Sequence, residues 1–378
     1  MLSFLWRFFS LNAKIFRHQF FRRPVLRTVK FPSITIILCS VFLVFSGCGS
    51  SSDEASELPF IPSGDLGKNI TIDGKTFLKT SFATVIEKGS SVTIPSEKYP
   101  RTGNVFIWDR TVTINNYEIS RFEVTQDLYE YVMGSLPHDD SDSRYKNEVQ
   151  KYRPVTGMSW FDAVEFCNKL SSLCGYECVY TMTKIIRKNK NSYIQSANVT
   201  CDFSKNGFRL PTEAEWEFAA RGAGKTSTDW NYKYPGSDNH KKVAWSVMNS
   251  SGYSDDDVLL RTHEVGLKQP NALGLYDMAG NAGEWCQDYW KCKQPGYEST
   301  IPKDDTYSYI NPVEHAGTFT DPVVDKSQYA SRVVRGGNYS SIAAYVANDN
   351  RYFSYQYQSA KNTSTPQTTA GIRLVRRP

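Results

Sequence analysis

The eight cysteines are the residues of this 378-residue chain with the widest range of possible chemistry. A cysteine can pair in a disulfide, bind a soft metal ion or carry a covalent modification, depending on its neighbours and its compartment. Cys174 and Cys178 are the most closely spaced, but no second close pair and no close histidine supports a zinc site. The histidines are scattered, at His18, His138, His240, His263 and His315. Zinc is therefore not expected.

Cys48 follows a segment that is typical of an export signal. Residues 1–47 contain seven basic residues and no acid, and they include the charge-free run Ile34–Phe45. This run is too short for a membrane span, which needs about 20 residues, but it fits the apolar core of a secretory signal. Ser46 and Gly47, directly before Cys48, resemble a bacterial lipobox, in which the cysteine is lipidated. The alternative is a signal anchor that contains a cysteine by chance.

The predicted location follows from this signal. We expect a signal peptide over 1–47, a lipid anchor at Cys48 and a place in the bacterial cell envelope. A Gly at position 49, where an Asp is the usual inner-membrane retention signal, favours the outer membrane or the cell surface. Residues 48–68 are small, polar and rich in Ser and Gly, which predicts a flexible tether. Residues 69–378 are then expected to form one domain.

The net charge of the chain changes meaning once the signal is set aside. The sequence has 44 basic and 39 acidic residues, a net charge of +5. Without the seven basic residues of 1–47, 37 basic and 39 acidic residues remain, a net charge of −2. A basic excess confined to an export signal is no evidence for nucleic acid binding. The membrane is expected as a partner through the lipid anchor only.

Six cysteines remain in the predicted domain, and an exported protein can pair them in disulfides. Several pairings are possible and the sequence does not select among them. The alternative is that several are reduced, because a free cysteine packs as a small hydrophobic residue. These six are Cys167, Cys174, Cys178, Cys201, Cys286 and Cys292.

Short strands and three helices are predicted to position these groups. Thr111–Ile119 alternates with a two-residue period, which predicts a strand, and Val92–Ile94 and Val105–Trp108 are also strand-like. Hydroxyl residues precede three helical patterns, at Thr125, Ser159 and Thr212. After Ala220 the sequence is rich in loop residues. These patterns alone predict an irregular α+β domain.

Long motifs in a fixed order give a more specific assignment. GFRLPTEAEWEFAARGAG begins at Gly207, NALGLYDMAGNAGEWCQDYW at Asn271, RVVRGGNY at Arg332 and GIRL at Gly371. Together with the earlier segments ISRFEVTQDLYEYV and PVTGMSWFDAVEFCNKLS, they resemble the formylglycine-generating enzyme, or sulfatase-modifying factor, family. The resemblance covers about Phe82–Pro378. It implies the α+β fold of that family, irregular, low in regular secondary structure and built on a C-type-lectin-like core.

The family's oxidase chemistry depends on two cysteines that bind copper. Counted from Gly336 and Gly337, these two positions fall on Ser341 and Val346. A hydroxyl and an isopropyl group cannot hold Cu(I), which prefers soft thiolates. We therefore expect no copper and assign no catalytic residue, although a divergent enzyme remains an alternative.

A structural calcium site is also implied by the resemblance. Asp277, Gly280, Ala282 and Glu284 match the family positions that hold one Ca²⁺. Two carboxylates with intervening backbone carbonyls in a glycine-rich turn suit this oxygen-seeking cation. The alternative is a loop held by hydrogen bonds from backbone N–H groups to the two carboxylates.

The segment Ser340–Thr369 has an unusual composition. It lacks Leu, Gly, Glu, Trp and Met and is rich in Ser, Ala, Asn, Thr and Tyr. It resembles the variable region of diversity-generating retroelement target proteins, some of which are lipoproteins with the same enzyme-like body. Tyrosines give a large contact area at low entropy cost, and Ser and Asn give adaptable hydrogen bonds. The expected ligand-binding residues are Tyr339, Ser341, Ile342, Ala344, Tyr345, Ala347, Asn348, Asn350, Tyr352, Tyr355 and Tyr357.

Taken together, the sequence predicts a surface-anchored lipoprotein with a catalytically inactive, formylglycine-generating-enzyme-like domain. This domain is expected to bind a protein or glycan ligand through a C-terminal face whose sequence is diversified. Two alternatives stay open: a divergent formylglycine-generating oxidase that acts on exported sulfatase-type proteins, and a structural envelope lipoprotein. A further alternative for Tyr352, Phe353, Tyr355 and Tyr357 is partial burial, because alternate residues of a strand face inward.

Overall fold

A computed structural model describes residues 67–94, 105–106, 110–137, 148–188, 193–251, 260–289, 317–323, 332–348, 352–353 and 369–378. All of them belong to the unit that spans Ala55–Pro378. The expected signal peptide, Cys48 and all but the last two residues of the expected tether lie outside the described residues, so these predictions stand as made. Within the described part, no helix has the length and apolar character that a membrane crossing requires.

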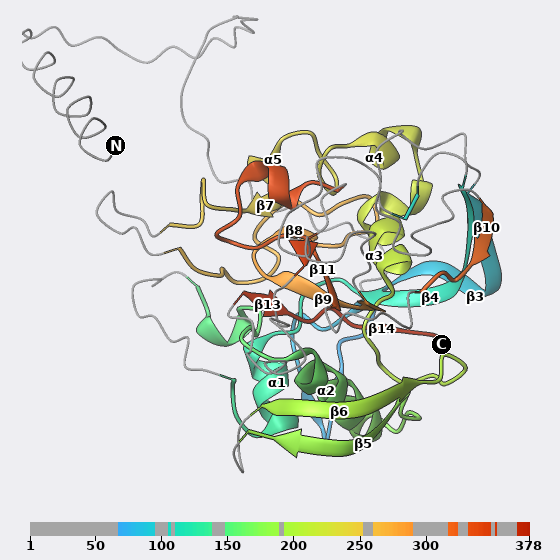
Figure 1. Cartoon of the computed structure of the whole chain (residues 1–378). Coiled ribbons are helices and arrows are strands. Elements are labelled where there is room, and N and C mark those ends of the chain that lie inside the picture. Colours follow the sequence, from blue (N-terminus) through green and yellow to red (C-terminus); the bar gives the residue numbers. More distant parts are fainter. Residues whose placement is uncertain are drawn as a thin grey trace, which may run out of the picture. The chain divides into compact units, whose positions relative to one another are not determined.

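Short strands alternate with a few helices along the chain (Figure 1). The strands are β1 Thr71–Ile72, β2 Lys75–Thr76, β3 Phe82–Ile94, β4 Arg110–Ser120, β5 Tyr180–Arg187, β6 Ile194–Cys201, β7 Ala244–Trp245, β8 Ala279–Gly280, β9 Gly283–Tyr289, β10 Gly317–Thr320, β11 Arg332–Arg335, β12 Tyr352–Phe353, β13 Ala370–Gly371 and β14 Val375–Arg376. The α-helices are α1 Gln126–Met133, α2 Trp160–Leu173, α3 Glu213–Ala220, α4 Ser227–Asn231 and α5 His240–Val243. The 3₁₀ helices are η2 Gln150–Tyr152, η3 Gly222–Gly224 and η4 Ala343–Val346. This confirms the predicted α+β class.

The first sheet is built on β4, which pairs antiparallel with β3 and β14 and parallel with β10. Alternate residues of β4 face the core, among them Val112 and Ile114, which are fully buried. The strands predicted over Val92–Ile94 and Thr111–Ile119 are therefore confirmed, inside β3 and β4. Val105 and Phe106, in contrast, are buried but belong to no strand.

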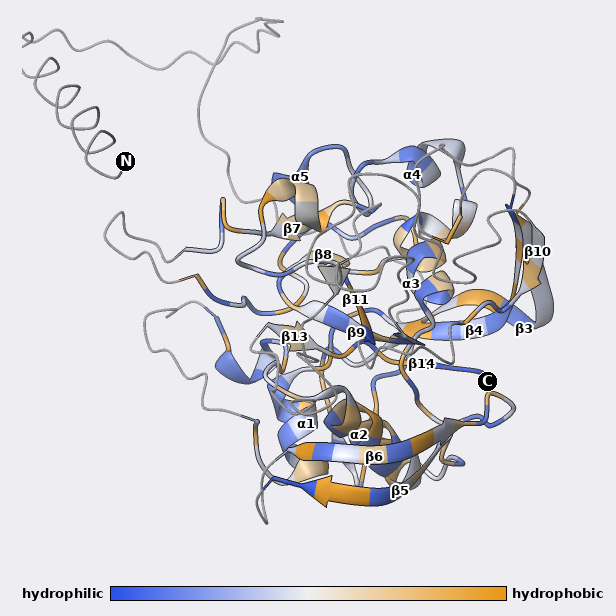
Figure 2. Ribbon diagram, viewed as in Figure 1, coloured by the Kyte–Doolittle hydropathy of each residue, from blue (hydrophilic) through white to orange (hydrophobic). Residues whose placement is uncertain are grey.

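The second sheet has the order β12-β11-β9-β13. The chain end joins the two sheets, because β13 pairs with β9 and β14 pairs with β4. One apolar cluster lies between the first sheet and α3, and another lies around α1, α2 and Trp285. Some apolar side chains remain outside the core: part of β5 is hydrophobic in Figure 2, and Ile186 of this strand is 56% exposed.

The predicted helices α1, α2 and α3 all form, and their caps differ. Ser159 and Thr212 form complete capping boxes with Asp162 and Glu215, so each first turn has its orphan N–H groups satisfied. Thr125 occupies the cap position of α1, but its side chain makes no capping hydrogen bond.

The five described cysteines of the domain, Cys167, Cys174, Cys178, Cys201 and Cys286, are all free in the structure, and Cys292 lies outside the described residues.

Helix α3 is buried on every side, including its three glutamates. Buried carboxylates need charged partners, and each has one. Arg209 holds Glu215 with two hydrogen bonds of 2.7 Å, and Glu217 lies 3.0 Å from Arg221. Arg335 of β11 lies 3.8 Å from Glu213 and 3.2 Å from Glu217. The pairs with Arg335 fix α3 against β11, the strand that directly precedes the predicted binding residues.

Candidate ligand-binding face

The segment that follows β11 begins with a sharp turn. Gly336 and Gly337 have φ angles of 87° and 69°, a left-handed conformation that favours glycine. The Asn338 side chain then accepts hydrogen bonds from the N–H and the hydroxyl of Ser340, at 2.9 and 2.7 Å. The Asn338 N–H donates to the Ser341 hydroxyl at 3.0 Å. The direction of the chain is therefore set before the predicted face begins.

Loops distant in sequence hold this segment in place. The Ser250 hydroxyl donates to the Tyr339 carbonyl at 2.6 Å, and the Val247 N–H donates to the Ser341 carbonyl at 3.0 Å. Further along, the Asn348 N–H donates to the Lys233 carbonyl at 2.8 Å. Residues 339–348, which we call the C-terminal segment, thus rest on a rigid support.

The structure divides the expected ligand-binding residues into two groups. Ile342 is 51% exposed and Ala344 is also exposed, whereas Tyr339 is half-buried. The side chains buried in the structure are those of Ser341, Ala347 and Asn348. Only the backbone is described for Tyr345 and Tyr352, and Asn350, Tyr355 and Tyr357 lie outside the described residues. The exposed part of the C-terminal segment is therefore centred on Ile342 and Ala344.

The two positions that carry copper-binding cysteines in the enzymes are built into the interior. Ser341 is 7% exposed, and its hydroxyl accepts the Asn338 N–H. Val346 is fully buried in an apolar cluster with Tyr234, Val243, Ala244, Ala279 and Ala347. Neither side chain supplies a soft donor, so this pair of residues does not fit Cu(I).

The residues expected to bind calcium have other partners. Both Glu284 oxygens accept hydrogen bonds from Arg373, and one also accepts the Trp216 indole N–H at 2.6 Å. One Asp277 oxygen accepts the Gly266 N–H at 2.7 Å. Ca²⁺ takes six to eight oxygen ligands, but in this arrangement both Glu284 oxygens already accept hydrogen bonds from Arg373 or Trp216. The set as arranged does not fit calcium, and binding of this ion stays a prediction from family resemblance.

A third carboxylate, that of Glu123, holds the loop between Asp277 and Glu284. Glu123 accepts hydrogen bonds from the Ala282 N–H and the Asn281 side chain, both at 2.8 Å. Burial raises the pKa of Glu123, and the charges of Asp277 and Glu284 raise it further. Gly280 donates its N–H to the Gly336 carbonyl at 2.8 Å. This loop therefore supports the turn from which the C-terminal segment starts.

Asp277→Asn is expected to make the protein more stable at neutral pH in a calcium chelator. The second Asp277 oxygen is buried and has no hydrogen-bond partner among the described residues. Burial raises the pKa of Asp277 from 3.8 to about 6. Because the folded state binds this proton more tightly than the unfolded state, ionisation costs stability as the pH rises from about 4 through 6. Urea unfolding across this range should show that the advantage of the variant is small at pH 4 and largest above pH 6.

Addition of calcium to the same samples tests the predicted ion. A bound cation favours the ionised carboxylate, so calcium would stabilise the original chain and not the Asp277→Asn variant. A calcium effect of equal size on both proteins would argue against Asp277 as a ligand.

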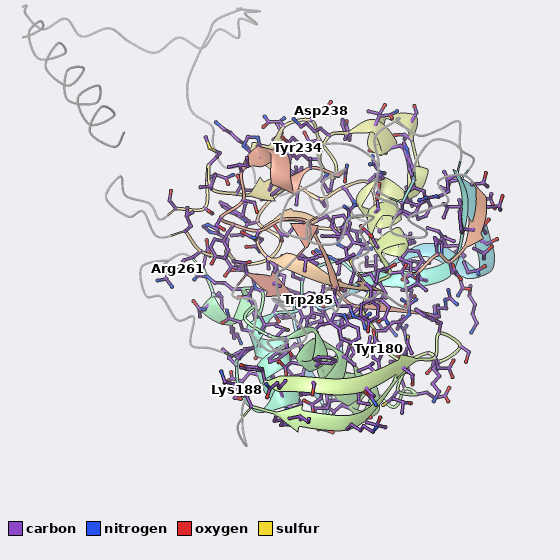
Figure 3. The ribbon with its side chains drawn as sticks, in the orientation of Figure 1. Tyr180, Lys188, Tyr234, Asp238, Arg261 and Trp285 are labelled. Atoms are coloured by element: carbon purple, nitrogen blue, oxygen red, sulfur yellow. The ribbon has the colours of Figure 1, made fainter. Side chains whose placement is uncertain are left out.

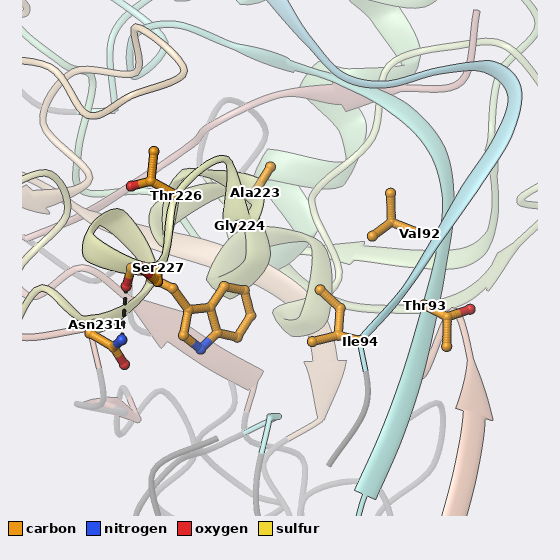
Figure 4. Close-up of a pocket in the computed structure, with 9 residues that line it drawn as sticks. Val92, Thr93, Ile94, Ala223, Gly224, Thr226, Ser227 and Asn231 are labelled. Atoms are coloured by element: carbon orange, nitrogen blue, oxygen red, sulfur yellow. Dashed lines mark hydrogen bonds between the residues drawn. The ribbon is translucent and has the colours of Figure 1, made fainter. Parts of the chain in front are cut away.

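Clefts elsewhere offer weaker candidates. The cleft drawn in Figure 4 has a volume of about 250 Å³, is lined by residues that include Ile94, Ser227 and Trp230, and has no titratable side chain in its lining. A larger one, of about 730 Å³, lies between Gly67–Thr71 and residues that include Tyr176 and Arg376. Neither is lined by any residue of the C-terminal segment.

Sequence reasoning missed part of the surroundings of the C-terminal segment. Trp245 stacks on His263 with ring centroids 3.7 Å apart, and the Lys268 ammonium lies 3.9 Å from the centre of its ring. Met248 is 63% exposed and follows Val247, whose N–H donates to the Ser341 carbonyl. The available signal was the basic run His240-Lys241-Lys242, three residues before Trp245, but no pattern placed it beside residues about a hundred positions later.

The fold and the motifs place the chain in a defined class of proteins. The family model of the sulfatase-modifying factor enzyme 1-like domain matches residues 78–378, and the chain belongs to this family. The likeness extends to "Chaperone protein LppX" of Paenibacillus barcinonensis, 37% identical over 194 residues, or 48% of this chain and 65% of that protein. The formylglycine-generating enzyme of Streptomyces coelicolor is 32% identical over 167 residues, or 44% of each chain. Each match thus spans less than two thirds of the relative.

Solved structures support the same class. "Treponema denticola variable protein 1" has a TM-score of 0.56 and 31% sequence identity, and the match covers 79% of this chain and 99% of that one. CarF, with a TM-score of 0.50 and 22% identity, shares the fold. These comparisons confirm the family and the fold that the sequence motifs predicted.

Proposed function

We propose that this protein is an envelope lipoprotein whose domain binds a protein or glycan ligand through the C-terminal segment and the residues after it. The observation that carries this proposal is the burial of the two positions at which the family's enzymes have copper-binding cysteines. Ser341 and Val346 are packed inward, whereas Ile342 and Ala344 between them are exposed. A rigid framework that presents a short exposed segment suits recognition better than oxidation.

Variation of this segment is a further part of the proposal. The composition of Ser340–Thr369 supports it, and so does the likeness to a protein described as variable. We expect a near-copy of the coding segment close to the gene, differing mainly at adenines, together with a reverse transcriptase gene. Absence of such a copy in the genome would contradict the variation and leave binding untouched.

Photo-crosslinking tests where a ligand binds. We expect a photoreactive amino acid at Ile342 to crosslink the full chain to a discrete partner on intact cells or in their surroundings. The same amino acid at Ile186, which is 56% exposed on β5, is the matched control. Crosslinks that form equally from both positions, or from Ile186 alone, would contradict a binding face at the C-terminal segment. Analysis by gel shift and glycan staining separates protein partners from glycans.

The oxidase alternative has a direct assay. We expect no aldehyde when the purified chain is incubated with copper, oxygen, a thiol reductant and a Cys-x-Pro-x-Arg peptide, because residues 341 and 346 supply no thiolate. Mass spectrometry of the peptide detects the aldehyde. Its formation at a rate above that of heat-inactivated protein would overturn the proposed function.

A chaperone role is a second candidate, favoured by the 37% identity to the Paenibacillus protein named a chaperone. Such a role predicts binding to unfolded rather than native proteins. Suppression of the heat-induced aggregation of citrate synthase, followed by light scattering, measures it. If the chain suppresses aggregation and an Ile342→Ser variant does so equally, a chaperone surface elsewhere replaces the proposed face.

A further inference from the structure

Five basic residues lie beside the C-terminal segment and form what we call the basic face: Lys233, His240, Lys241, Lys242 and Lys268. Lys233, Lys241 and Lys242 are exposed, and His240 and Lys268 are partly exposed. A local concentration of lysines is notable on a body whose sequence outside the signal has a slight acidic excess.

Hydrogen bonds bring these residues together from three parts of the chain. The Lys268 ammonium donates to the Lys241 carbonyl at 3.0 Å, and the Gln269 N–H donates to the Lys242 carbonyl at 2.9 Å. The Lys233 carbonyl accepts the Asn348 N–H at 2.8 Å. The basic face is therefore joined to the end of the C-terminal segment through the backbone.

The positive charge of this face is not neutralised within the described part of the chain. None of its four lysines forms an ion pair with another described residue. Asp238 is near, and its carboxylate accepts the backbone N–H of Lys233 at 2.9 Å. The basic residues also lie close enough to act on His240. Burial lowers the pKa of His240, and the positive charges of Lys241, Lys268 and Lys233 lower it further.

Two exposed apolar side chains continue the surface. Met248 and Ile342 are 63% and 51% exposed, and the bond between Val247 and Ser341 places their chain segments side by side. An apolar centre with a polar rim is the usual arrangement of a protein-binding surface, and methionine is enriched there. Methionine in particular adapts its shape to different partners.

The aromatic residues of this region argue against two other kinds of ligand. A sugar ring stacks on a free aromatic face, but Trp245 has His263 on its ring at 3.7 Å and Lys268 at 3.9 Å, Tyr234 is 4% exposed, and Tyr232 and Tyr339 are only partly exposed. Binding at a lipid surface uses Trp, Phe or Leu side chains that enter the headgroup region. Met248 and Ile342 are the most exposed large apolar side chains among the described residues here, and Leu267, next to Lys268, is 38% exposed, so a single Leu is available for such a contact.

We propose that the basic face and its two apolar neighbours bind an acidic segment of a partner protein, one that carries apolar side chains among its carboxylates. This inference rests on the proposed function and specifies its ligand as a protein. Acidic side chains of the partner would face the lysines, and its apolar side chains would contact Ile342 and Met248. Charge complementarity of this kind raises the association rate and selects the partner.

The test uses the full chain in detergent and a fluorescent peptide of glutamates interspersed with leucines. We expect anisotropy to show binding that weakens as salt is raised, and no binding to the same peptide with glutamine in place of glutamate. Lys241→Glu together with Lys242→Glu should weaken binding by about tenfold or more. Lys233→Glu alone should weaken it in the same direction. Because these side chains are exposed, thermal unfolding should be unchanged.

A matched variant controls for net charge. Lys88→Glu with Lys188→Glu changes the same number of exposed charges, and Lys188 lies at the other end of the molecule from Tyr234 in Figure 3. It should alter binding by no more than about twofold. Equal weakening by both double variants would overturn the inference, and so would binding of polyuronate or of phosphatidylglycerol vesicles in preference to the peptide. A failure of this kind would leave crosslinking from Ile342 as a separate test of the proposed function.

Discussion

Glu284→Ala is expected to lower the free energy of unfolding by about 3–5 kcal/mol, because it leaves a buried guanidinium without its counter-charge. Arg373 and Glu284 are both fully buried and lie 2.7 Å apart. Arg373 also donates to the carbonyls of Ser120 and Tyr276, at 2.9 and 2.7 Å. These contacts join the chain end to β4 and β9, so their loss affects both sheets.

A second ion pair on the same chain end is the control. Arg376 and Glu118 lie 2.8 Å apart, but their side chains are 22% and 19% exposed. Glu118→Ala should therefore cost no more than about 1 kcal/mol. Urea unfolding followed by tryptophan fluorescence measures both variants. Similar small losses in the two would mean that Arg373 finds water or another partner, and that the buried pair does not join the sheets as described.

The locally encoded elements are the ones that the sequence predicted well. The capping boxes at Ser159 and Thr212 depend on residues three positions apart, and both form. The alternation of β4 likewise reports its buried face directly. For α3 the sequence shows Glu213 and Glu215 in the first turn after Thr212, but it does not show their partners. The structure adds Arg209 and Arg335 as their partners, and Arg335 comes from more than a hundred residues away.

The candidate site was predicted less completely, because it too depends on contacts between residues that are far apart in the sequence. The positions of Ser341 and Val346 follow from counting along one motif, but their burial depends on contacts with Val247 and with the cluster around Tyr234. Composition marked Ser340–Thr369 as a whole and could not separate exposed Ile342 from buried Asn348. The basic face was missed because α5 is brought to this segment only by the tertiary fold.

Gly280→Ala is expected to cost about 3–5 kcal/mol, since it combines backbone strain with a steric clash. Gly280 has a φ of +73°, and a Cβ there would lie 1.8 Å from the Trp245 carbonyl oxygen. This oxygen accepts the Asn281 N–H at 3.0 Å, and Gly280 pairs with Trp245 between β7 and β8. The backbone cannot move away without separating these two strands.

Gly74→Ala isolates the strain from the clash. Gly74 has a similar φ of +79°, but a Cβ there would meet no atom within 4 Å. Its replacement should cost about 1–2 kcal/mol, from the left-handed backbone alone. Urea unfolding gives both values, and equal losses would show that β7 yields to the added methyl group. If the larger loss is found, acidic-peptide binding should also weaken in folded Gly280→Ala protein, because Trp245 and Lys268 depend on β7 for their position.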